Sequence, residues 1–515
     1  MTVNSGTAWA GALLQIIAMA ALASAVLSNT ISSEGSKKRS ALSSTRDGFL
    51  FGLAWFTVGV GWVYISMHRY GGMHSALAGA ATLIFAAYLA LYPAIACLIA
   101  HAWQFGNQKS QSNWSSLRFI AGFASAMTLL ELARGYFFTG FPWISPGYAH
   151  VDSPLSSIAP WGGVYAITWV SCACAAALAW IAVSTGTAAV RMALPMIVLV
   201  ASLTLPKWLQ SDASVPTNQA LTVTLIQGNV NQAMKFDAGQ VIGNIRMYLD
   251  QIEANLPVAT KANESAHLFV LPETAWPTSL GNMPDEIKDR FDRITSSGQI
   301  KVAIGAPFWH SPERTKSPSI SNSVIVMGQK GSENYRYDKQ HLVPFGEFIP
   351  SGFQWFLDIM QMPLGAFKRG DPNQPYFAIQ DQKIAFNICY EDLFGEELAN
   401  QTQQANLLIN LSNIAWFDDS KALDQHLQIA RMRVLEIRKP MLRATNTGAT
   451  VVIDADGSVR NALPWITRGI ITTSIKGAVG TTPYARWTNT PIAVACGFVA
   501  LILSAMAFAL RRRYA

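Results

Sequence analysis

Charged side chains are scarce in this sequence. They make up 13% of the 515 residues, against about 25% in ordinary soluble domains, whereas half of the residues are hydrophobic. This balance excludes a protein that is soluble along its whole length. The net charge of +7 does not indicate a nucleic-acid binder, because the basic residues lie beside apolar runs and form no stripe interleaved with aromatic residues. They fit the flanks of membrane helices better.

Cysteine is scarce as well. Four of the five cysteines lie inside long apolar runs: Cys97, Cys172, Cys174 and Cys496. No spacing typical of a disulfide framework or a metal site is present, so we expect neither disulfides nor a cofactor. Repeats and low-complexity tracts are also missing. The remaining cysteine, Cys389 in FNICYEDLFG, is the only one in the polar half of the chain.

Long apolar runs, in contrast, are abundant. Each is long enough to cross a bilayer as a helix. They cover residues 7–28, 47–66, 75–102, 117–134, 158–183, 188–206 and 490–510. We predict a transmembrane bundle of about six spans over 1–206, a large insert over 207–487 and a closing membrane helix over 488–515. The first run has no Lys or Arg before it, so we expect a retained helix rather than a cleaved signal peptide.

Basic residues beside these runs predict the orientation of the insert. They follow the first, third and last runs, and one lies between the fifth and sixth. They are Lys37, Lys38, Arg39, Arg46, Lys109, Arg118, Arg191, Arg511, Arg512 and Arg513. Cytoplasmic loops are enriched in Lys and Arg, so we expect these loops in the cytoplasm and the insert on the outer side of the membrane.

The insert has the pattern of an α/β domain. Six runs have the length and β-branched content of strands: LTVTLIQ (221–227), HLFVLPE (267–273), KVAIGA (301–306), SNSVIVM (321–327), KIAFNIC (383–389) and NLLINLS (406–412). Two later runs, ATVVIDA and GIITTSI, are predicted strands too. Apolar residues at helical spacing over 421–438 predict a helix there.

Three residues of complementary chemistry follow predicted strands. Cys389 closes KIAFNI, Glu273 closes LFVLP, and Lys339 follows a short strand-like stretch. Open α/β sheets place their sites at the carboxyl ends of strands, so a thiol, a base and a cation could meet there. A free thiol, with a pKa of about 8.5, is only a few per cent ionised at neutral pH and needs a base such as Glu273. Lys339 could stabilise an oxyanion.

Each of these residues also has a purely structural interpretation. A cysteine at a strand end is commonly a small buried hydrophobe. Glu273 could cap the helix after the Pro-rich turn, and Lys339 could be a solvated surface lysine. Composition and spacing leave both interpretations open.

The motifs around the three residues resemble those of a known superfamily. LPETAWP, YDKQHLVPFGEFIP and NICYEDLFG resemble the Glu, Lys and Cys motifs of the nitrilase (carbon–nitrogen hydrolase) superfamily. With its flanking membrane helices, the chain is similar to the apolipoprotein N-acyltransferase family. Further motifs agree: GWVYIS (61–66), ELARGYFFTGFPWISPGY (131–148), QGNVNQAMKF (227–236), INLSNIAWF (409–417) and QIARMRVLEIRKPMLRATNTG (428–448). The resemblance implies an α/β nitrilase-like αββα sandwich inserted in an α-helical transmembrane bundle.

The resemblance also implies a reaction, a ping-pong acyl transfer that completes lipoprotein maturation. Cys389 would take an acyl chain from a phospholipid, typically phosphatidylethanolamine, as a thioester. The chain would then pass to the α-amino group of the S-diacylglyceryl cysteine of an apolipoprotein. Glu273 would be the general base, and Lys339 with the backbone N–H of Tyr390 would hold the oxyanion.

Supporting residues and location are implied in the same way. Glu347 matches a further family carboxylate that supports the site. Tyr390 and Glu391 match the residues that follow the nucleophile and are expected to position or stabilise the site. The implied location is the bacterial inner membrane, with a multi-pass monomer whose insert, the catalytic domain, faces the periplasm.

Two other functions remain as alternatives. A membrane-tethered amide hydrolase would use the same triad, with water as the acyl acceptor. The second alternative is a transporter or scaffold with a degenerate sensory domain. The intact triad speaks against it, because such a protein would not require one. The membrane segments also contain few of the ionisable residues that a transport path needs.

Three further features carry expectations of their own. The segment 349–367 is rich in Phe, Trp, Met and Leu, so it would either embrace acyl chains or pack as an ordinary loop. Glu131 and Arg134 share a helix face and are expected to form a structural ion pair, with a lipid headgroup contact as the alternative. His426 is expected to be a structural histidine.

The chain departs from the family pattern in three places. Seven membrane runs are present where the family usually has eight. Phe236 stands where Trp is frequent, and Ile414 stands where Asp is frequent. The change at Ile414 could loosen a turn beside the site, but no triad member is affected.

Overall fold

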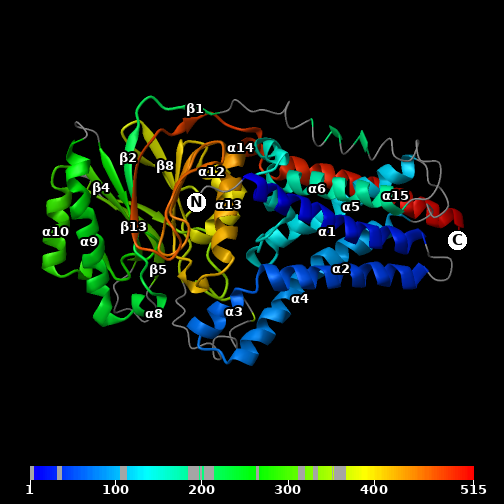
Figure 1. Cartoon of the computed structure of the whole chain (residues 1–515), viewed down its shortest axis with the longest axis horizontal. Helices are drawn as coiled ribbons and strands as arrows, with labels where there is room; N and C mark the ends of the chain where they lie inside the picture. Colours follow the sequence, from blue (N-terminus) through cyan, green and yellow to red (C-terminus); the bar gives the residue numbers. More distant parts are fainter. Residues whose placement is uncertain are drawn as a thin grey trace. The chain divides into compact units, whose positions relative to one another are not determined.

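The computed structural model describes most of the chain (Figure 1). The described residues are 5–31, 37–104, 113–183, 214–261, 266–310, 319–328, 334–350 and 367–514, with the isolated positions 196, 197, 200, 201, 204 and 352. Contacts divide the chain into two compact units. The α/β unit comprises residues 62–78 and 212–485, and the helical unit comprises residues 2–61, 79–211 and 486–515.

The helical unit is built from long apolar helices. Those in the described residues are α1 (Ser5–Ile31), α2 (Lys37–Gly59), α4 (Ser75–Ala102), α5 (Asn113–Tyr136), α6 (Ala159–Val183) and α15 (Thr490–Tyr514). Within the described ranges, five helices are long and apolar enough to cross a membrane, or up to six if one bent pair counts as a span. The protein is therefore a membrane protein with several candidate spans. The predicted run 188–206 lies outside the described residues except at isolated positions.

The predicted run 47–66 is interrupted by a bend, and it forms one span only if the bent pair of helices is counted together. α2 ends at Gly59, and the helix that follows is bent by 57° from it. Gly59 and Gly61 fall at this break, and glycine is a poor helix former. A Cβ on Gly59 would lie 2.2 Å from Cδ1 of Ile144, so only glycine fits there without rearrangement. Beyond the bend, two short helices belong to the α/β unit by their contacts: α3 (Val63–Ile65) and η1 (Ser66–Tyr70).

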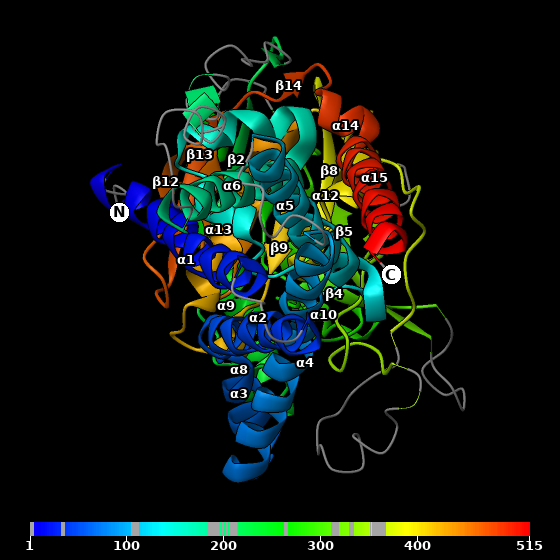
Figure 2. The same ribbon diagram turned by 90° about the vertical axis from the view of Figure 1, so that its right-hand side faces the viewer.

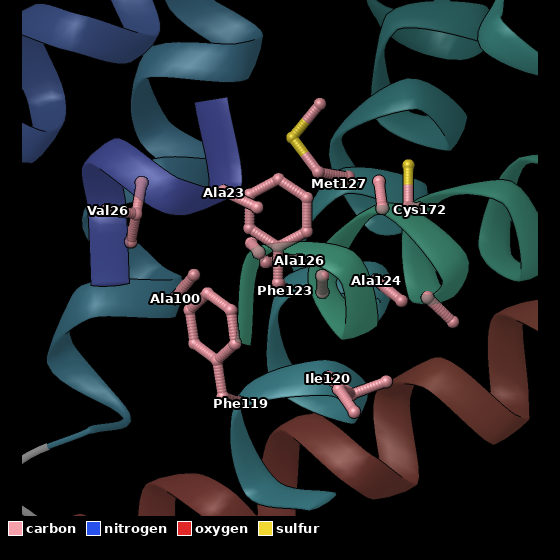
Figure 3. Packing of buried hydrophobic residues seen from close by; sticks show 14 of the residues in the cluster. Ala23, Val26, Ala100, Phe119, Ile120, Phe123, Ala124, Ala126, Met127 and Cys172 are labelled. Atoms are coloured by element: carbon pink, nitrogen blue, oxygen red, sulfur yellow. The ribbon is translucent and has the colours of Figure 1, made fainter. Parts of the chain in front are cut away.

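Small side chains bring the helices of the helical unit close together. α6 packs against both α1 and α5, and these three helices lie next to one another in Figure 2. Figure 3 shows Phe119 and Phe123 of α5 among small residues that include Ala23 and Ala100. Small residues let helix backbones approach closely within a membrane. Cys172, which lies in one of the apolar runs, is a free cysteine buried in this core.

The predicted ion pair between Glu131 and Arg134 is present. Nη2 of Arg134 lies 2.5 Å from Oε2 of Glu131, and both side chains are almost fully buried. Ser145 donates a 2.5 Å hydrogen bond to the same carboxylate, and Arg134 also donates to the carbonyls of Phe141 and Trp143. All of these named contacts lie within the helical unit. The pair therefore ties the end of α5 to the loop that follows, as the structural interpretation requires.

In the part of the chain that the structure describes, the α/β unit contains two six-stranded sheets and a small two-stranded one. The two-stranded sheet pairs β1 (Val215–Pro216) with β14 (Ala478–Val479). The strands of the first six-stranded sheet, in spatial order, are β13 (Gly469–Ile475), β2 (Leu221–Gln227), β3 (His267–Val270), β4 (Ile300–Trp309), β5 (Ile320–Met327) and β6 (Tyr335–Asp338). Those of the second are β12 (Val459–Ala462), β11 (Val451–Ile453), β10 (Met441–Thr445), β9 (Leu407–Ser412), β8 (Gln382–Ile388) and β7 (Phe377–Ile379). The predicted strands over 221–227 and 469–475 have the bounds of β2 and β13.

The two six-stranded sheets pack face to face between helices. Leu225 of β2 and Phe386 of β8 belong to one buried cluster that contains the inner faces of both sheets. α9 (Ala238–Lys261) and α10 (Asp285–Thr295) cover the outer face of the first sheet, and α13 (Ala422–Ile437) covers that of the second. Figure 1 shows these helices on opposite sides of the strands. This arrangement is the predicted αββα sandwich.

Parallel strands bring several loops to one edge of the sandwich. β8 and β9 are parallel neighbours, with Ile388 opposite Leu411. β3 is parallel to both β2 and β4. Residues that follow β3, β8 and β9 therefore emerge at the carboxyl ends of their strands, which is where sites of open α/β sheets lie.

Candidate active site

Cys389 stands at a sharp turn between a strand and a helix. It follows β8 and opens the short helix η6 (Cys389–Leu393). Its φ is 52°, which is uncommon for a residue other than glycine. Such backbone conformations cluster at functional sites because the surrounding structure must hold them in place. The thiol is free and the residue is partly exposed.

His426 of α13 holds this turn from behind. Its Nε2 lies 3.1 Å from the backbone oxygen of Cys389, and its Nδ1 lies 3.1 Å from Nη2 of Arg443. Since a guanidinium can only donate, Nδ1 is the acceptor and Nε2 carries the hydrogen that binds the Cys389 carbonyl. Burial, followed by the charge of Arg443, keeps the pKa of His426 well below its usual value. His426 is therefore a neutral structural residue, as predicted.

Glu273, Lys339 and Glu347 form one buried cluster. Nζ of Lys339 lies 2.9 Å from Oε1 of Glu347 and 3.5 Å from Oε1 of Glu273. The side-chain amide of Asn322, on β5, donates to the same two oxygens at 2.7 Å and 2.8 Å. The backbone N–H of Val343 donates to the other oxygen of Glu347 at 2.9 Å. The structure thus brings together two of the three predicted triad residues and the predicted supporting carboxylate.

The carboxylates keep Lys339 charged. Burial by itself would lower the pKa of Lys339, but the negative charges of Glu347 and Glu273 outweigh it and raise that pKa above its usual value. The ammonium can therefore act as a permanent cation within the site. Gly370 donates to the backbone oxygen of Lys339, and Lys339 donates to that of Asn322, so its backbone is held on both sides.

Asn413 connects Glu273 with Cys389. Its backbone N–H donates a 2.8 Å hydrogen bond to Oε2 of Glu273 and also interacts with the thiol of Cys389. Burial, followed by the charge of Glu273, raises the pKa of Cys389 above its usual value, whereas Lys339 and this N–H act in the opposite direction. The resting thiol is consequently protonated, and a nearby base must take its proton when it reacts.

Glu391 ties the Cys389 turn to the loop after Lys339. Its carboxylate accepts hydrogen bonds from the backbone N–H groups of Ile388, Gln340 and His341 and from the hydroxyl of Tyr337, at 2.6–3.2 Å. Burial raises the pKa of Glu391 to about 8 in spite of these donors. Glu391 therefore connects two loops that carry predicted triad residues.

Tyr390 and Asp392, on either side of Glu391, contact neighbouring side chains. The ring of Tyr390 lies 5.8 Å from that of His341 and 5.4 Å from that of Phe394, measured between ring centres. Asp392 forms a completely buried ion pair with Arg443. Both contacts hold the turn that presents Cys389.

The segment 62–70 also reaches this region. Arg69 forms an ion pair with Asp418, and the hydroxyl of Tyr70 donates to the same carboxylate. Asp418 has a φ of 46° and a ψ of −150°, a conformation that favours glycine. The indole N–H of Trp62 donates a 3.0 Å hydrogen bond to Gln425 on α13. The segment thus contacts the loop after β9, which carries Asn413, and the helix that carries His426.

Sequence reasoning missed several residues of this arrangement. Asn322, Asn413, Lys235 and Arg443 were not singled out, although the last three lie inside motifs that pointed to the family. Asn322 carries no sequence signal of its own, because it is one polar position within a strand pattern.

Two earlier expectations concern the segment 349–367 and Ile414. The segment 349–367 lies almost entirely outside the described residues. Ile414 is buried and packs on Gly448: a Cβ added to Gly448 would lie 2.2 Å from Cδ1 of Ile414.

The described residues contain no group of three His, Cys, Asp or Glu side chains that could hold a metal ion.

Comparisons with known proteins cover both units. Residues 5–177 match the apolipoprotein N-acyltransferase N-terminal domain, and residues 222–484 match the carbon–nitrogen hydrolase family. The chain is 42% identical over 478 residues to an apolipoprotein N-acyltransferase of Ralstonia nicotianae, covering 90% of this chain and 85% of that protein. It is 39% identical over 530 residues to one of Bordetella bronchiseptica, covering 98% and 93%.

Among solved structures, the chain is similar to the C. elegans NitFhit protein. The sequence identity is 17% and the TM-score 0.36, over 50% of this chain and 60% of that one. The family matches and the two relatives, rather than this likeness, carry the assignment.

Proposed function

Because the chain belongs to the apolipoprotein N-acyltransferase family, we propose that Cys389 is its nucleophile, Glu273 its general base and Lys339 a donor to the oxyanion. The family is one of acyltransferases with lipoprotein substrates, so the chain is an enzyme of this kind. The assignment of these roles is supported chiefly by Asn413, whose N–H donates to Glu273 and also acts to lower the pKa of Cys389.

In the first half of the reaction the acyl chain moves to the enzyme. Sγ of Cys389 attacks the ester carbonyl of a phospholipid while Glu273 takes the thiol proton. Lys339 and the backbone N–H of Tyr390 hold the oxygen that becomes negative. The C–O bond then breaks, the lyso-phospholipid oxygen takes the proton from Glu273, and a thioester on Cys389 remains. Removal of one oxyanion donor typically costs on the order of 10²–10³ in rate.

In the second half the acyl chain moves to the acceptor. The α-amino group of an S-diacylglyceryl cysteine attacks the thioester, and Glu273 takes a proton from the nitrogen. The C–S bond breaks, an amide forms, and the thiolate of Cys389 recovers its proton from Glu273. Glu347 and Glu391 hold the Lys339 side chain and the Cys389 turn in place through both halves.

The location of the site is part of the same proposal. We place the α/β unit in the periplasm at the bacterial inner membrane, because the basic residues beside the apolar runs are expected in the cytoplasm. The donor is a membrane phospholipid, with phosphatidylethanolamine as the expected species, and the protein acts as a monomer.

Intact-mass measurement of the purified protein with phospholipid tests this function. We expect a mass increase of one acyl chain that is absent in Cys389→Ala and is discharged by a peptide with an N-terminal diacylglyceryl cysteine. Release of free fatty acid without acylation of the peptide would contradict acyl transfer and favour the amide hydrolase. No adduct on the wild-type protein would contradict the thioester itself.

A further inference from the structure

Lys235 is a second buried lysine beside the site, and the mechanism above does not use it. It ends α8 (Gln232–Lys235), within the motif QGNVNQAMKF, and is 2% exposed. Its Nζ donates a 2.9 Å hydrogen bond to the backbone oxygen of Glu273. An ammonium has three hydrogens to donate, but in the part of the chain that the structure describes Lys235 has no other acceptor and no carboxylate within 4.0 Å.

The short helix α8 is fixed to both sides of the site. Lys235 holds the turn of Glu273, as described. Gln232, one turn earlier, accepts a 2.8 Å hydrogen bond from the side-chain amide of Asn413, whose backbone N–H donates to Glu273. Asn446 binds both Asn413 and the backbone of Val230, just before α8. The position of the Lys235 ammonium relative to the reacting groups is therefore set by buried hydrogen bonds.

Lys235 and Lys339 differ in their surroundings. Lys339 lies between two carboxylates, whereas Lys235 contacts a carbonyl oxygen. Burial lowers the pKa of Lys235 to about 7, and the charges of Glu273 and Cys389 act against this decrease. Lys235 consequently gains or loses its proton near neutral pH, while Lys339 keeps its charge.

The charge balance of the site depends on this proton. Glu273, Glu347 and Lys339 together carry one net negative charge. Protonated Lys235 brings the total to zero. The total does not change when the proton of Cys389 moves to Glu273 and the negative charge passes to the sulfur or the acyl oxygen. With neutral Lys235, the same step must take place in a buried site with excess negative charge, which is unfavourable.

The interaction between Lys235 and Cys389 is reciprocal. A negative charge on Cys389 stabilises the protonated form of Lys235. By linkage, protonated Lys235 must stabilise the ionised form of Cys389 to the same extent.

We propose that Lys235 is a charge-compensating positioning residue, whose ammonium supports the thiolate of Cys389 and the tetrahedral intermediate formed from it. The inference rests on the proposed role of Cys389 as nucleophile. Acyl transfer then depends on two buried cations, a permanent one at Lys339 and a titrating one at Lys235.

Alkylation of Cys389 by iodoacetamide, followed by intact mass from pH 6 to 9, tests the proposal without any acyl donor. Cys389→Ala measures the background from the membrane cysteines. We expect Lys235→Met to slow alkylation at pH 7 by about tenfold, the effect of an opposite charge that shifts a thiol pKa by one unit. Lys235→Arg, which keeps the charge, should recover part of the rate.

The slope of the pH profile provides a test on the wild-type protein itself. Below the pKa of a thiol, the fraction present as thiolate normally increases tenfold per pH unit. Above pH 7, however, Lys235 loses its proton and no longer stabilises the thiolate of Cys389. The wild-type rate should therefore rise less than tenfold per unit between pH 7 and 8.5, and Lys235→Met should restore the full slope. A shallow slope that persists in Lys235→Met would assign the effect to Glu391, whose pKa is about 8, and would overturn the proposal.

Lys439→Met is the matched control. Lys439 is 4% exposed and donates to the carbonyls of Thr402 and Ala405, so its replacement also removes a buried ammonium. The dependence of Cys389 alkylation on pH in Lys439→Met should be the same as in the wild type. Identical alkylation profiles for the wild type and Lys235→Met would refute the proposed role of Lys235 but not the proposed function. A wild-type protein that forms no acyl adduct would refute the proposed function.

Discussion

The side-chain amide of Asn322 donates a 2.8 Å hydrogen bond to Oε1 of Glu273, although 49 residues separate them in the chain. The same nitrogen lies 2.7 Å from Oε1 of Glu347. Two buried carboxylates therefore share one neutral donor and one cation, Lys339. Asn322 sets the distance between the proposed base and the carboxylate that supports the oxyanion donor.

Replacing Asn322 should slow acylation of the enzyme. Asn322→Ala leaves two buried carboxylate oxygens without this donor, at a cost of about 1–3 kcal/mol, or about five- to 160-fold in rate. Single-turnover formation of the acyl adduct measures the effect. Asn461→Ala, at an exposed position on β12, is the control and should react at the wild-type rate. An unchanged rate in Asn322→Ala would show that Glu273 is positioned without it.

Arg443 should be important for stability. Its ion pair with Asp392 is completely buried, so Arg443→Met leaves an unpaired buried carboxylate, at a cost of about 3–5 kcal/mol. The pair Arg460–Asp454 is partly exposed, and Arg460→Met should cost at most about 1 kcal/mol. Thermal unfolding of the two variants in detergent gives the comparison. Equal midpoints would contradict the assigned difference in burial.

Replacing Asp418 by alanine should destabilise the protein more than replacing it by glycine. Both replacements remove the contacts to Arg69 and Tyr70, but only glycine adopts the φ of 46° without strain. Asp418→Gly should therefore be more stable than Asp418→Ala by about 1–2 kcal/mol. Denaturation midpoints and acylation rates measure the outcome.

The exposed neighbour Asp419 provides the control for Asp418. Asp419→Ala should change stability by at most about 0.5 kcal/mol. If Asp418→Ala and Asp418→Gly were equally stable, the backbone conformation of Asp418 would not be a source of strain.

Lys235 should make stability depend on pH. Its pKa is about 7 in the folded protein, against an ordinary value of 10.5. Between these values the unfolded chain binds one proton more than the folded protein at this position, so stability rises with pH. Relative to Lys235→Met, the wild-type unfolding midpoint should therefore increase from pH 7 to 9.5. Lys439, with a pKa of about 8, adds a rise only above pH 8. A constant difference between the two proteins would contradict a titrating Lys235.

Strand positions in the sandwich were predictable because short runs rich in apolar and β-branched residues favour strands. β2 and β13 match their predicted runs residue for residue, and α13 differs from its predicted bounds by one residue at each end. The membrane helices were predictable for a related reason, since only long apolar helices satisfy their backbone groups in lipid. The requirement for glycine at position 59 was not predictable, because it comes from Ile144, which lies far away in the sequence.

The sequence by itself determined most of the elements of this protein: the apolar runs, many of the strands, the motifs that identify its family, and the three residues Glu273, Lys339 and Cys389. The strands β7, β10 and β12 were not predicted. Only the tertiary structure decided what surrounds them. Asn322, Asn413 and Lys235 approach the site from separate segments, and their hydrogen bonds form only when the strands are assembled. Burial then sets the charge of each group, because a lysine between carboxylates keeps its proton and a lysine beside a carbonyl loses it near neutral pH.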